Sequence, residues 1–210
     1  GGTQIPVKLT RALSELGIRS YSGYGMTEMA STAFAKQSDG KIGVGQPLLG
    51  REFKLVNEEV WLKGAGLAMG YWRDGCVDPL TNAEGWFQSK DKGQWLDNEL
   101  VIQGRLDNMF ISGGENIQPE EIEKVIAQSD LVKQVFVLPK YDEEFGHRPV
   151  AIVEFHMPFN ESAVESLNVF LQGRLERFKQ PVAYYELPQD LIQGAIKISR
   201  KALADWLLQQ

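Results

Sequence analysis

One stretch of sequence decides the fold: Gly104-Arg105-Leu106-Asp107-Asn108-Met109-Phe110-Ile111-Ser112-Gly113-Gly114-Glu115-Asn116-Ile117-Gln118-Pro119-Glu120-Glu121-Ile122-Glu123. The alternating residues 100–103 before it are typical of a strand. A charged pair, Arg105 and Asp107, follows. The apolar residues 109–111 then lead to two glycines, which can adopt backbone angles that other residues rarely take.

A helix is predicted to begin at the end of this stretch. Pro119 suits the first helical position, where its missing N–H is not needed. Acidic residues follow in the first turn, where the helix dipole favours negative charge. Ile122, Val125 and Ile126 recur at helical spacing and predict one buried face. The expected order is strand, charged bend, strand, glycine loop and helix, and the bend at Asp107 predicts a boundary between domains 1–106 and 107–210.

The part before the bend reads as a strand–helix piece followed by a small antiparallel sheet or partial barrel. We expect a helix over residues 6–16 ended by Gly17, a strand over 18–21 and a polar loop over 22–31. Short strands are expected at 52–56, 59–63 and 100–103, the first two joined as a hairpin by Asn57 and Glu58.

The part after the bend alternates helices with a few strands. After the helix at Pro119 we expect strands at 134–138, 150–156 and 184–187, a loop at 139–148, and helices at 161–178 and 200–208. This alternation predicts a compact α/β or α+β unit. Because a small antiparallel sheet precedes it, the whole chain is assigned to the α+β class.

Composition narrows the function classes. The 210 residues are 43% hydrophobic and 24% charged, and the net charge of −6 gives no reason to expect nucleic-acid or membrane binding. No apolar run reaches transmembrane length. Cys76 is the single cysteine, which excludes an intrachain disulfide and fits a reducing, cytoplasmic environment. The two histidines and this cysteine do not have the spacing of a metal site.

The loop Ser22-Gly23-Tyr24-Gly25-Met26-Thr27-Glu28-Met29-Ala30-Ser31 is a candidate site. Its chemistry would allow Tyr24 to stack on a flat ring, Thr27 to bond a phosphate and Glu28 to hold a hard cation. A polar turn is the alternative interpretation of the same residues.

Four motifs, in order, resemble the adenylate-forming enzymes, the superfamily of acyl-CoA synthetases, luciferases and peptide-synthetase adenylation domains. Residues 24–28 are similar to the family's Tyr-Gly-x-Thr-Glu, and 85–93 to its Gly-Trp-Phe-x-Thr-Gly-Asp-x-Gly, with Ser89-Lys90 in place of Thr-Gly. The stretch 104–123 resembles the family's hinge and glycine loop. Residues 194–200 are similar to its Gly-Lys-Ile-x-Arg, although Ile196 replaces the glycine.

The resemblance implies roles for particular residues. Tyr24 and Gly25 would face the adenine and acyl pocket, Thr27 would contact phosphate and Glu28 would bind Mg²⁺. Asp91 and Arg105 would bind the ribose of ATP, and Lys197 would act on the carboxylate substrate and the α-phosphate. Asp107 would be the hinge of a C-terminal lid domain, while Gly113, Gly114 and Glu115 would approach the thiol of coenzyme A.

The family also provides a phosphate-binding loop, rich in Ser, Thr and Gly and ending in Pro-Lys, which does not occur in this sequence. The chain opens on Gly1-Gly2 instead of Met. We therefore expect a fragment that lacks most of the large domain, forms little acyl-adenylate alone, and exposes apolar surface that favours association into a homo-oligomer. The acid substrate remains open, with aryl and fatty acids as candidates. The alternative to an acyl-CoA synthetase is a non-catalytic binding module with an enzyme-derived fold.

Overall fold

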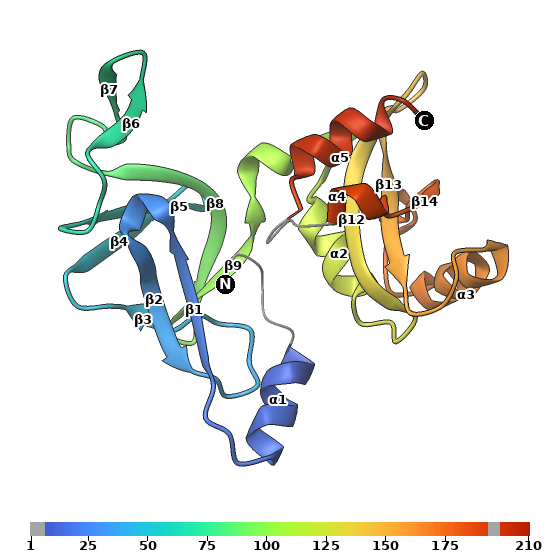
Figure 1. The fold of residues 1–210 in the computed structure, drawn as a ribbon, viewed down its shortest axis with the longest axis horizontal. Helices are drawn as coiled ribbons and strands as arrows, with labels where there is room; N and C mark the ends of the chain where they lie inside the picture. Colours follow the sequence, from blue (N-terminus) through green and yellow to red (C-terminus); the bar gives the residue numbers. More distant parts are fainter. Residues whose placement is uncertain (1–6, 193–197) are drawn as a thin grey trace. The chain divides into compact units, whose positions relative to one another are not determined.

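A computed structural model describes residues 7–192 and 198–210 of the chain. They form two compact units, Gly1–Leu106 and Asp107–Gln210. The first unit contains a mixture of helices and antiparallel strands, and the second contains a helix-covered sheet (Figure 1).

The first unit begins with helix α1, Val7–Glu15, which ends at Gly17 with a φ of 72°. Strands β1 (Tyr21–Met26), β2 (Ser31–Gln37) and β3 (Gln46–Pro47) follow and form an antiparallel sheet in the order β1-β2-β3. A short 3-10 helix, Thr27–Met29, joins β1 to β2.

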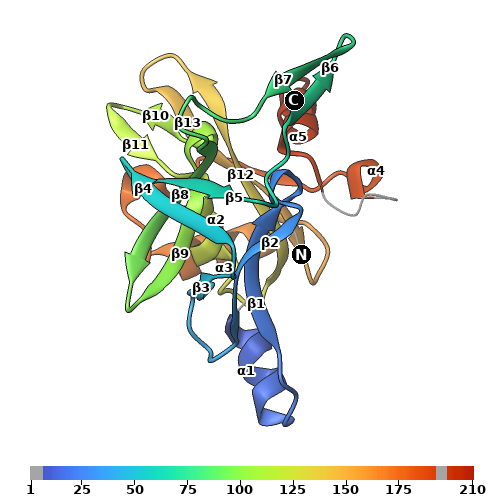
Figure 2. The same cartoon turned by 90° about the vertical axis from the view of Figure 1, so that its left-hand side faces the viewer.

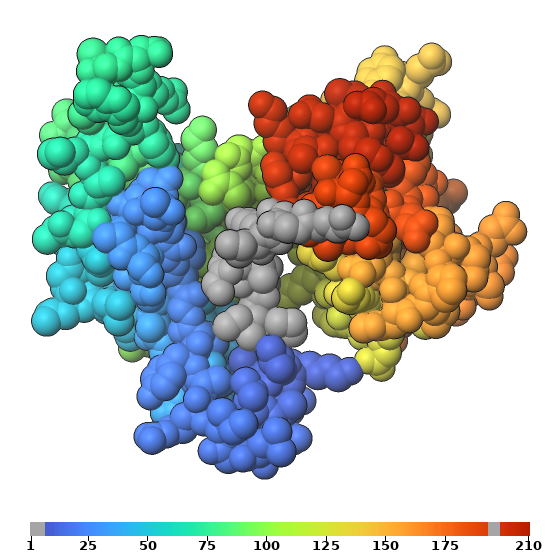
Figure 3. Space-filling model, viewed as in Figure 1, coloured from blue at the N-terminus to red at the C-terminus, as the bar shows by residue number. Residues whose placement is uncertain are grey.

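A second antiparallel sheet has the order β4-β5-β8-β9, formed by β4 (Arg51–Val56), β5 (Glu59–Gly64), β8 (Phe87–Leu96) and β9 (Glu99–Arg105). The hairpin of β6 (Gly70–Arg73) and β7 (Cys76–Pro79) projects from this unit (Figures 1 and 3). Buried side chains of both sheets and of the 3-10 helix share one core: Met29, Ala33, Phe34, Val60, Leu62, Phe87 and Leu100.

A 3-10 helix, Leu106–Asn108, spans the boundary between the units, and a small hairpin of β10 (Phe110–Ser112) and β11 (Glu115–Ile117) follows. Helix α2, Pro119–Ile126, is followed by β12 (Val132–Asp142) and β13 (Gly146–Phe155). Helix α3 (Glu161–Leu171), a 3-10 helix (Arg177–Lys179), β14 (Tyr184–Glu186), α4 (Gln189–Ile192) and α5 (Arg200–Leu207) complete the unit.

The β12-β13-β14 sheet is covered on both faces, because successive residues of β13 alternate between two cores. Ala151, Val153 and Phe155 pack with α2 and α3. Val150 and Ile152 pack instead with Leu203 and Leu207 of α5 and their neighbours. Figure 2 shows the same elements after a quarter turn.

Several expected elements differ from the observed ones. Residues 22–26, expected to form a loop, belong to β1, and the strand expected at 18–21 begins only at Tyr21. Strands β2 and β8 were not predicted. The expected loop at 139–148 is mostly the paired ends of β12 and β13. Helix α3 ends at Leu171 instead of 178, because Gly173 takes a φ of 73° that ends the helix.

Candidate functional site

The first part of the site is a charged pair on neighbouring strands. Antiparallel pairing of β8 with β9 places Asp91 directly opposite Arg105. Their side chains form an ion pair in which Arg105 Nη1 lies 3.3 Å from Asp91 Oδ1. Asp91 is buried, with 8% of its surface exposed, whereas Arg105 is exposed. The two residues that the sequence assigned to the ribose are therefore together in the fold.

Tyr24 reaches the same carboxylate from the other sheet of this unit. Its hydroxyl donates a hydrogen bond of 2.5 Å to Asp91 Oδ2. Its ring packs near Phe34, with 6.0 Å between the ring centroids. Burial, and next the negative charge of Asp91, raise the pKa of the Tyr24 hydroxyl well above its usual range. The hydroxyl is therefore a neutral donor at physiological pH.

The backbone around Asp91 is fixed by the residues that depart from the family motif. Ser89 Oγ donates to the Val60 carbonyl oxygen at 2.6 Å and accepts from the Asp91 N–H at 3.1 Å. Lys90 has a φ of 60°, the left-handed conformation that glycine adopts without strain. Its N–H donates to Glu59 Oε1 at 2.9 Å. Lys90 thus takes the backbone shape of the glycine it replaces.

Thr27 and Glu28 lie in the 3-10 helix after β1. The buried side chain of Met29 anchors this helix in the core, while the Thr27 side chain is exposed. Glu28 Oε1 accepts a 2.5 Å hydrogen bond from the Tyr71 hydroxyl, and the Glu28 carbonyl oxygen accepts from the Ala68 N–H at 2.8 Å. Two hydrogen bonds therefore join this helix to β6 and to the residues directly before it.

Gly25 is required by close backbone approach. The β1–β2 register shifts between Tyr24 and Gly25, and a Cβ atom at Gly25 would lie 1.9 Å from the Ser31 carbonyl oxygen. The missing side chain allows β1 to bend directly before Thr27. Gly25 consequently shapes the site instead of contributing a functional group.

The glycine loop is the tip of the β10–β11 hairpin in the second unit. Gly113 and Gly114 have φ values of 57° and 88°. The Gly113 N–H donates to the Phe145 carbonyl oxygen at 2.9 Å, and Glu115 is exposed on β11. Asp107 is exposed in the 3-10 helix that spans the boundary between the units.

Lys197 lies outside the described residues. The described chain resumes at Ile198, and α5 begins after Ser199, whose side chain caps the Ala202 N–H. Arg200 then donates to the Val137 carbonyl oxygen at 2.9 Å and forms an ion pair with Glu123 of α2. Arg200 belongs to the same motif as Lys197, and its described contacts anchor the start of α5.

The chemistry of Glu28 is compatible with a bound Mg²⁺. The ion often uses one or two protein carboxylates together with substrate phosphates, and does not need a cage of protein ligands. Within residues 7–192 and 198–210 no group of three or more His, Cys, Asp or Glu side chains could hold a metal. Glu28, half-buried and held by Tyr71, fits the one-carboxylate arrangement.

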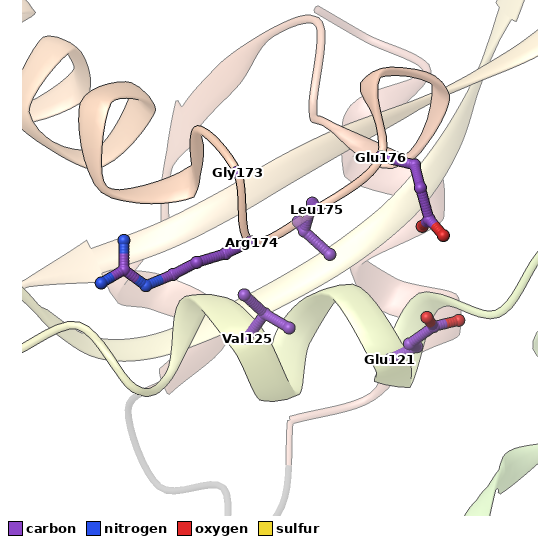
Figure 4. A pocket seen from close by; sticks show the side chains of 6 residues that line it. All are labelled: Glu121, Val125, Gly173, Arg174, Leu175 and Glu176. Atoms are coloured by element: carbon purple, nitrogen blue, oxygen red, sulfur yellow. The ribbon is translucent and has the colours of Figure 1, made fainter.

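A shallow hollow in the second unit contains none of the predicted site residues. It has a volume of about 460 Å³ and lies between α2 and the segment after α3 (Figure 4). Two carboxylates of its lining, Glu121 and Glu176, form ion pairs with Lys179 at 2.7 Å and 2.9 Å. The charged side chains that line the hollow therefore already have partners within the second unit.

Sequence reasoning missed the contributions of Ser89, Tyr71 and Phe145. Ser89 was noted only as a departure from the motif, and Tyr71 and Phe145 lie outside the four motifs. No local pattern indicates that Tyr71 meets Glu28, 43 positions earlier in the chain. None of the helices in the described ranges combines the length and apolar character needed to cross a bilayer.

Comparison with known proteins identifies the class. The family model of AMP-binding enzymes matches residues 1–72. A variant of Escherichia coli MenE with bound OSB-AMS superposes on all of this chain with a TM-score of 0.90 and 51% identity, over 46% of its own length. The chain belongs to the AMP-binding, adenylate-forming superfamily.

Within that superfamily, the compactness of residues 41–104 and the strings at 145–151 and 196–200 resemble bacterial 2-succinylbenzoate–CoA ligase, an enzyme of menaquinone biosynthesis. The chain is 68% identical to the Haemophilus influenzae 2-succinylbenzoate–CoA ligase and 52% identical to that of E. coli. Both matches include the whole chain and 46% of the relative, so the chain spans about half the length of these relatives.

Proposed function

We propose that this chain is part of an ATP-dependent acid–thiol ligase that activates 2-succinylbenzoate as its acyl-adenylate and transfers the acyl group to coenzyme A. The observation that supports the proposal best is the ion pair between Asp91 and Arg105, in which the Asp91 carboxylate is buried and accepts a hydrogen bond from Tyr24. The homology to 2-succinylbenzoate–CoA ligases supports the choice of acid.

The domains follow from the same proposal. Residues 1–106 would be the C-terminal part of the large AMP-binding domain, and 107–210 the small lid domain with its hinge at Asp107. ATP and coenzyme A would be substrates, and the lone Cys76 and the need for both substrates favour a cytoplasmic enzyme.

In the adenylation step, Asp91 and Arg105 would hold the ribose and Tyr24 and Gly25 would line the adenine side. Thr27 would donate to a phosphate oxygen, and Glu28 would hold Mg²⁺, which neutralises phosphate charge when bound. The Lys197 ammonium would stabilise charge that develops on the α-phosphate while pyrophosphate leaves.

In the thioester step, the Gly113–Gly114 turn would leave room for the thiol of coenzyme A. Because neither glycine has a side chain, the backbone there can approach a narrow ligand closely. Glu115, exposed beside the two glycines, would border the space that the thiol enters. Bending at Asp107 would separate this step from the first.

The test uses a chimera in which these 210 residues replace the matching part of the H. influenzae relative. ATP–pyrophosphate exchange with 2-succinylbenzoate and thioester formation are measured for the chimera and its variants. We expect both reactions, and loss of exchange in Asp91→Asn. The matched control Asp74→Asn neutralises an exposed carboxylate on the β6–β7 hairpin and should have no effect.

Lys197→Ala divides the two steps. It should reduce exchange by roughly 100-fold, equivalent to about 3 kcal/mol of transition-state stabilisation, yet leave thioester formation from supplied acyl-adenylate intact. Equal loss in both reactions would contradict the assigned role. A chimera without exchange for any carboxylic acid would favour the non-catalytic binding module, and exchange only with another acid would overturn 2-succinylbenzoate.

A further inference from the structure

We propose that Tyr24 is a positioning residue whose hydroxyl orients the Asp91 carboxylate and thereby sets the preference of the site for ribose over deoxyribose. This inference rests on the proposed function, in which Asp91 binds the ribose. It adds a role for the Tyr24 hydroxyl that is distinct from any contact of its ring with adenine.

The two oxygens of Asp91 are held by different donors. Tyr24 donates to Oδ2 at 2.5 Å, and Arg105 Nη1 lies 3.3 Å from Oδ1. The terminal torsion of an aspartate is otherwise soft, with a broad distribution of angles. A donor at each oxygen restricts this torsion, so the plane of the carboxylate is defined before a nucleotide arrives.

Tyr24 is better fixed than Arg105 for this task. Its half-buried ring lies beside Phe34 and packs against the core of the first unit, whereas the Arg105 side chain is 45% exposed. A tyrosine also has only two side-chain torsions, so little freedom is left once the ring is packed. The hydrogen bond to Oδ2 is therefore the more rigid of the two anchors.

The backbone of the acceptor is fixed as well. The Asp91 N–H donates to Ser89 Oγ, which itself donates to the Val60 carbonyl oxygen. The position of the Asp91 backbone thus depends on β5 and β8, and the orientation of its carboxylate depends on β1 and β9. Loss of the Tyr24 hydroxyl would leave the backbone in place and weaken only the restraint on the orientation of the carboxylate.

An oriented carboxylate favours a ligand with two adjacent hydroxyls. Because its two oxygens lie about as far apart as the 2′ and 3′ hydroxyls of a ribose, each oxygen can accept from one hydroxyl. A carboxylate that rotates loses one of these bonds part of the time. Hydrogen bonds to charged acceptors are stronger than neutral ones, so the loss affects ATP more than 2′-deoxy-ATP.

The experiment compares ATP with 2′-deoxy-ATP in the pyrophosphate-exchange assay of the chimera. In Tyr24→Phe we expect kcat/KM for ATP to fall by about 10-fold, while the value for 2′-deoxy-ATP changes less than 3-fold. The preference for ATP should fall accordingly. Replacing Tyr24 by p-aminophenylalanine keeps a donor on the ring and should restore most of the preference.

Tyr21→Phe is the matched control, because Tyr21 lies on the same strand with 63% of its surface exposed. It should leave both values unchanged. An equal fall for both nucleotides in Tyr24→Phe, or an unchanged ATP value, would overturn the positioning role. An Asp91→Asn variant that uses ATP normally would instead overturn the ribose site itself, and with it the proposed function.

Discussion

Replacing Lys90 by glycine should stabilise the first unit. Lys90 has a φ of 60°, and a left-handed conformation costs an L-residue about 1–2 kcal/mol. Glycine avoids this strain but loses about 0.5–1 kcal/mol more backbone entropy on folding. The difference is a gain of up to about 1.5 kcal/mol. The exposed side chain adds no packing loss, and the hydrogen bond from the backbone N–H to Glu59 is kept.

The assay is urea and thermal unfolding of the chain, followed by circular dichroism. For a unit of about 100 residues the expected gain corresponds to a midpoint up to about 7 °C higher. Gln88→Gly is the matched control, because Gln88 is exposed on the same strand without a positive φ. Gln88→Gly should lower stability by about 0.5–1 kcal/mol. If Lys90→Gly lowers the midpoint as Gln88→Gly does, the argument from backbone strain is wrong.

Three further predictions concern named contacts. Gly25→Ala should destabilise the first unit by about 3 kcal/mol in urea unfolding, because the new Cβ would lie 1.9 Å from the Ser31 carbonyl oxygen. Burial raises the pKa of the Tyr24 hydroxyl, so on raising the pH this group ionises first in the unfolded chain. The free energy of unfolding should therefore fall above about pH 10, by about 1.4 kcal/mol per pH unit. Tyr24→Phe should remove this contribution to the pH dependence of stability. Arg200→Leu should lower the stability of the second unit by about 2 kcal/mol, since it leaves the Glu123 carboxylate without its ion pair, and Arg200→Leu with Glu123→Leu should recover part of the loss in a double-mutant cycle.

Opposite results would identify which argument fails. A stable Gly25→Ala variant would mean that β1 and β2 do not approach as closely as described. Equal alkaline slopes for the wild-type chain and Tyr24→Phe would contradict the raised pKa of Tyr24. If the losses in free energy of unfolding for Arg200→Leu and Glu123→Leu add up in the double variant, the two side chains are not coupled.

Local signals were sufficient for the elements that depend on neighbouring residues. Helix α2 begins at Pro119 and buries Ile122 and Ile126, as its spacing predicted. The β4–β5 hairpin turns at Asn57 and Glu58, which both take positive φ values that suit a two-residue turn. In these segments, turn chemistry and hydrophobic spacing agree with the tertiary structure.

The missed strands are those whose glycines and polar residues hid the pattern. In β1, Gly23 and Gly25 suggested a loop, yet pairing with β2 determines the strand. In β8, Lys90 and Gly93 obscured the strict alternation of buried and exposed residues that the fold contains. Propensity is a weak guide where cross-strand pairing supplies the stability.

Members of the candidate site could be proposed from the sequence, but the contacts between them could not. Motif similarity selected Tyr24, Asp91 and Arg105. The Tyr24–Asp91 bond joins residues 67 positions apart and links two sheets, so no local spacing predicts it. The role of Ser89 likewise depends on the Val60 carbonyl of a neighbouring strand.

The two-residue turn between β8 and β9 has an evolutionary consequence. Asp97 and Asn98, with φ values of 49° and 64°, fix the alignment that sets Asp91 opposite Arg105. A single-residue insertion there that moved the whole of one strand would send every side chain beyond it to the other face of the sheet. Homologues that keep this carboxylate–guanidinium pair should therefore conserve the length of the turn, whatever its sequence. A homologue with a longer or shorter turn should also differ at the register shift between Lys92 and Gly93.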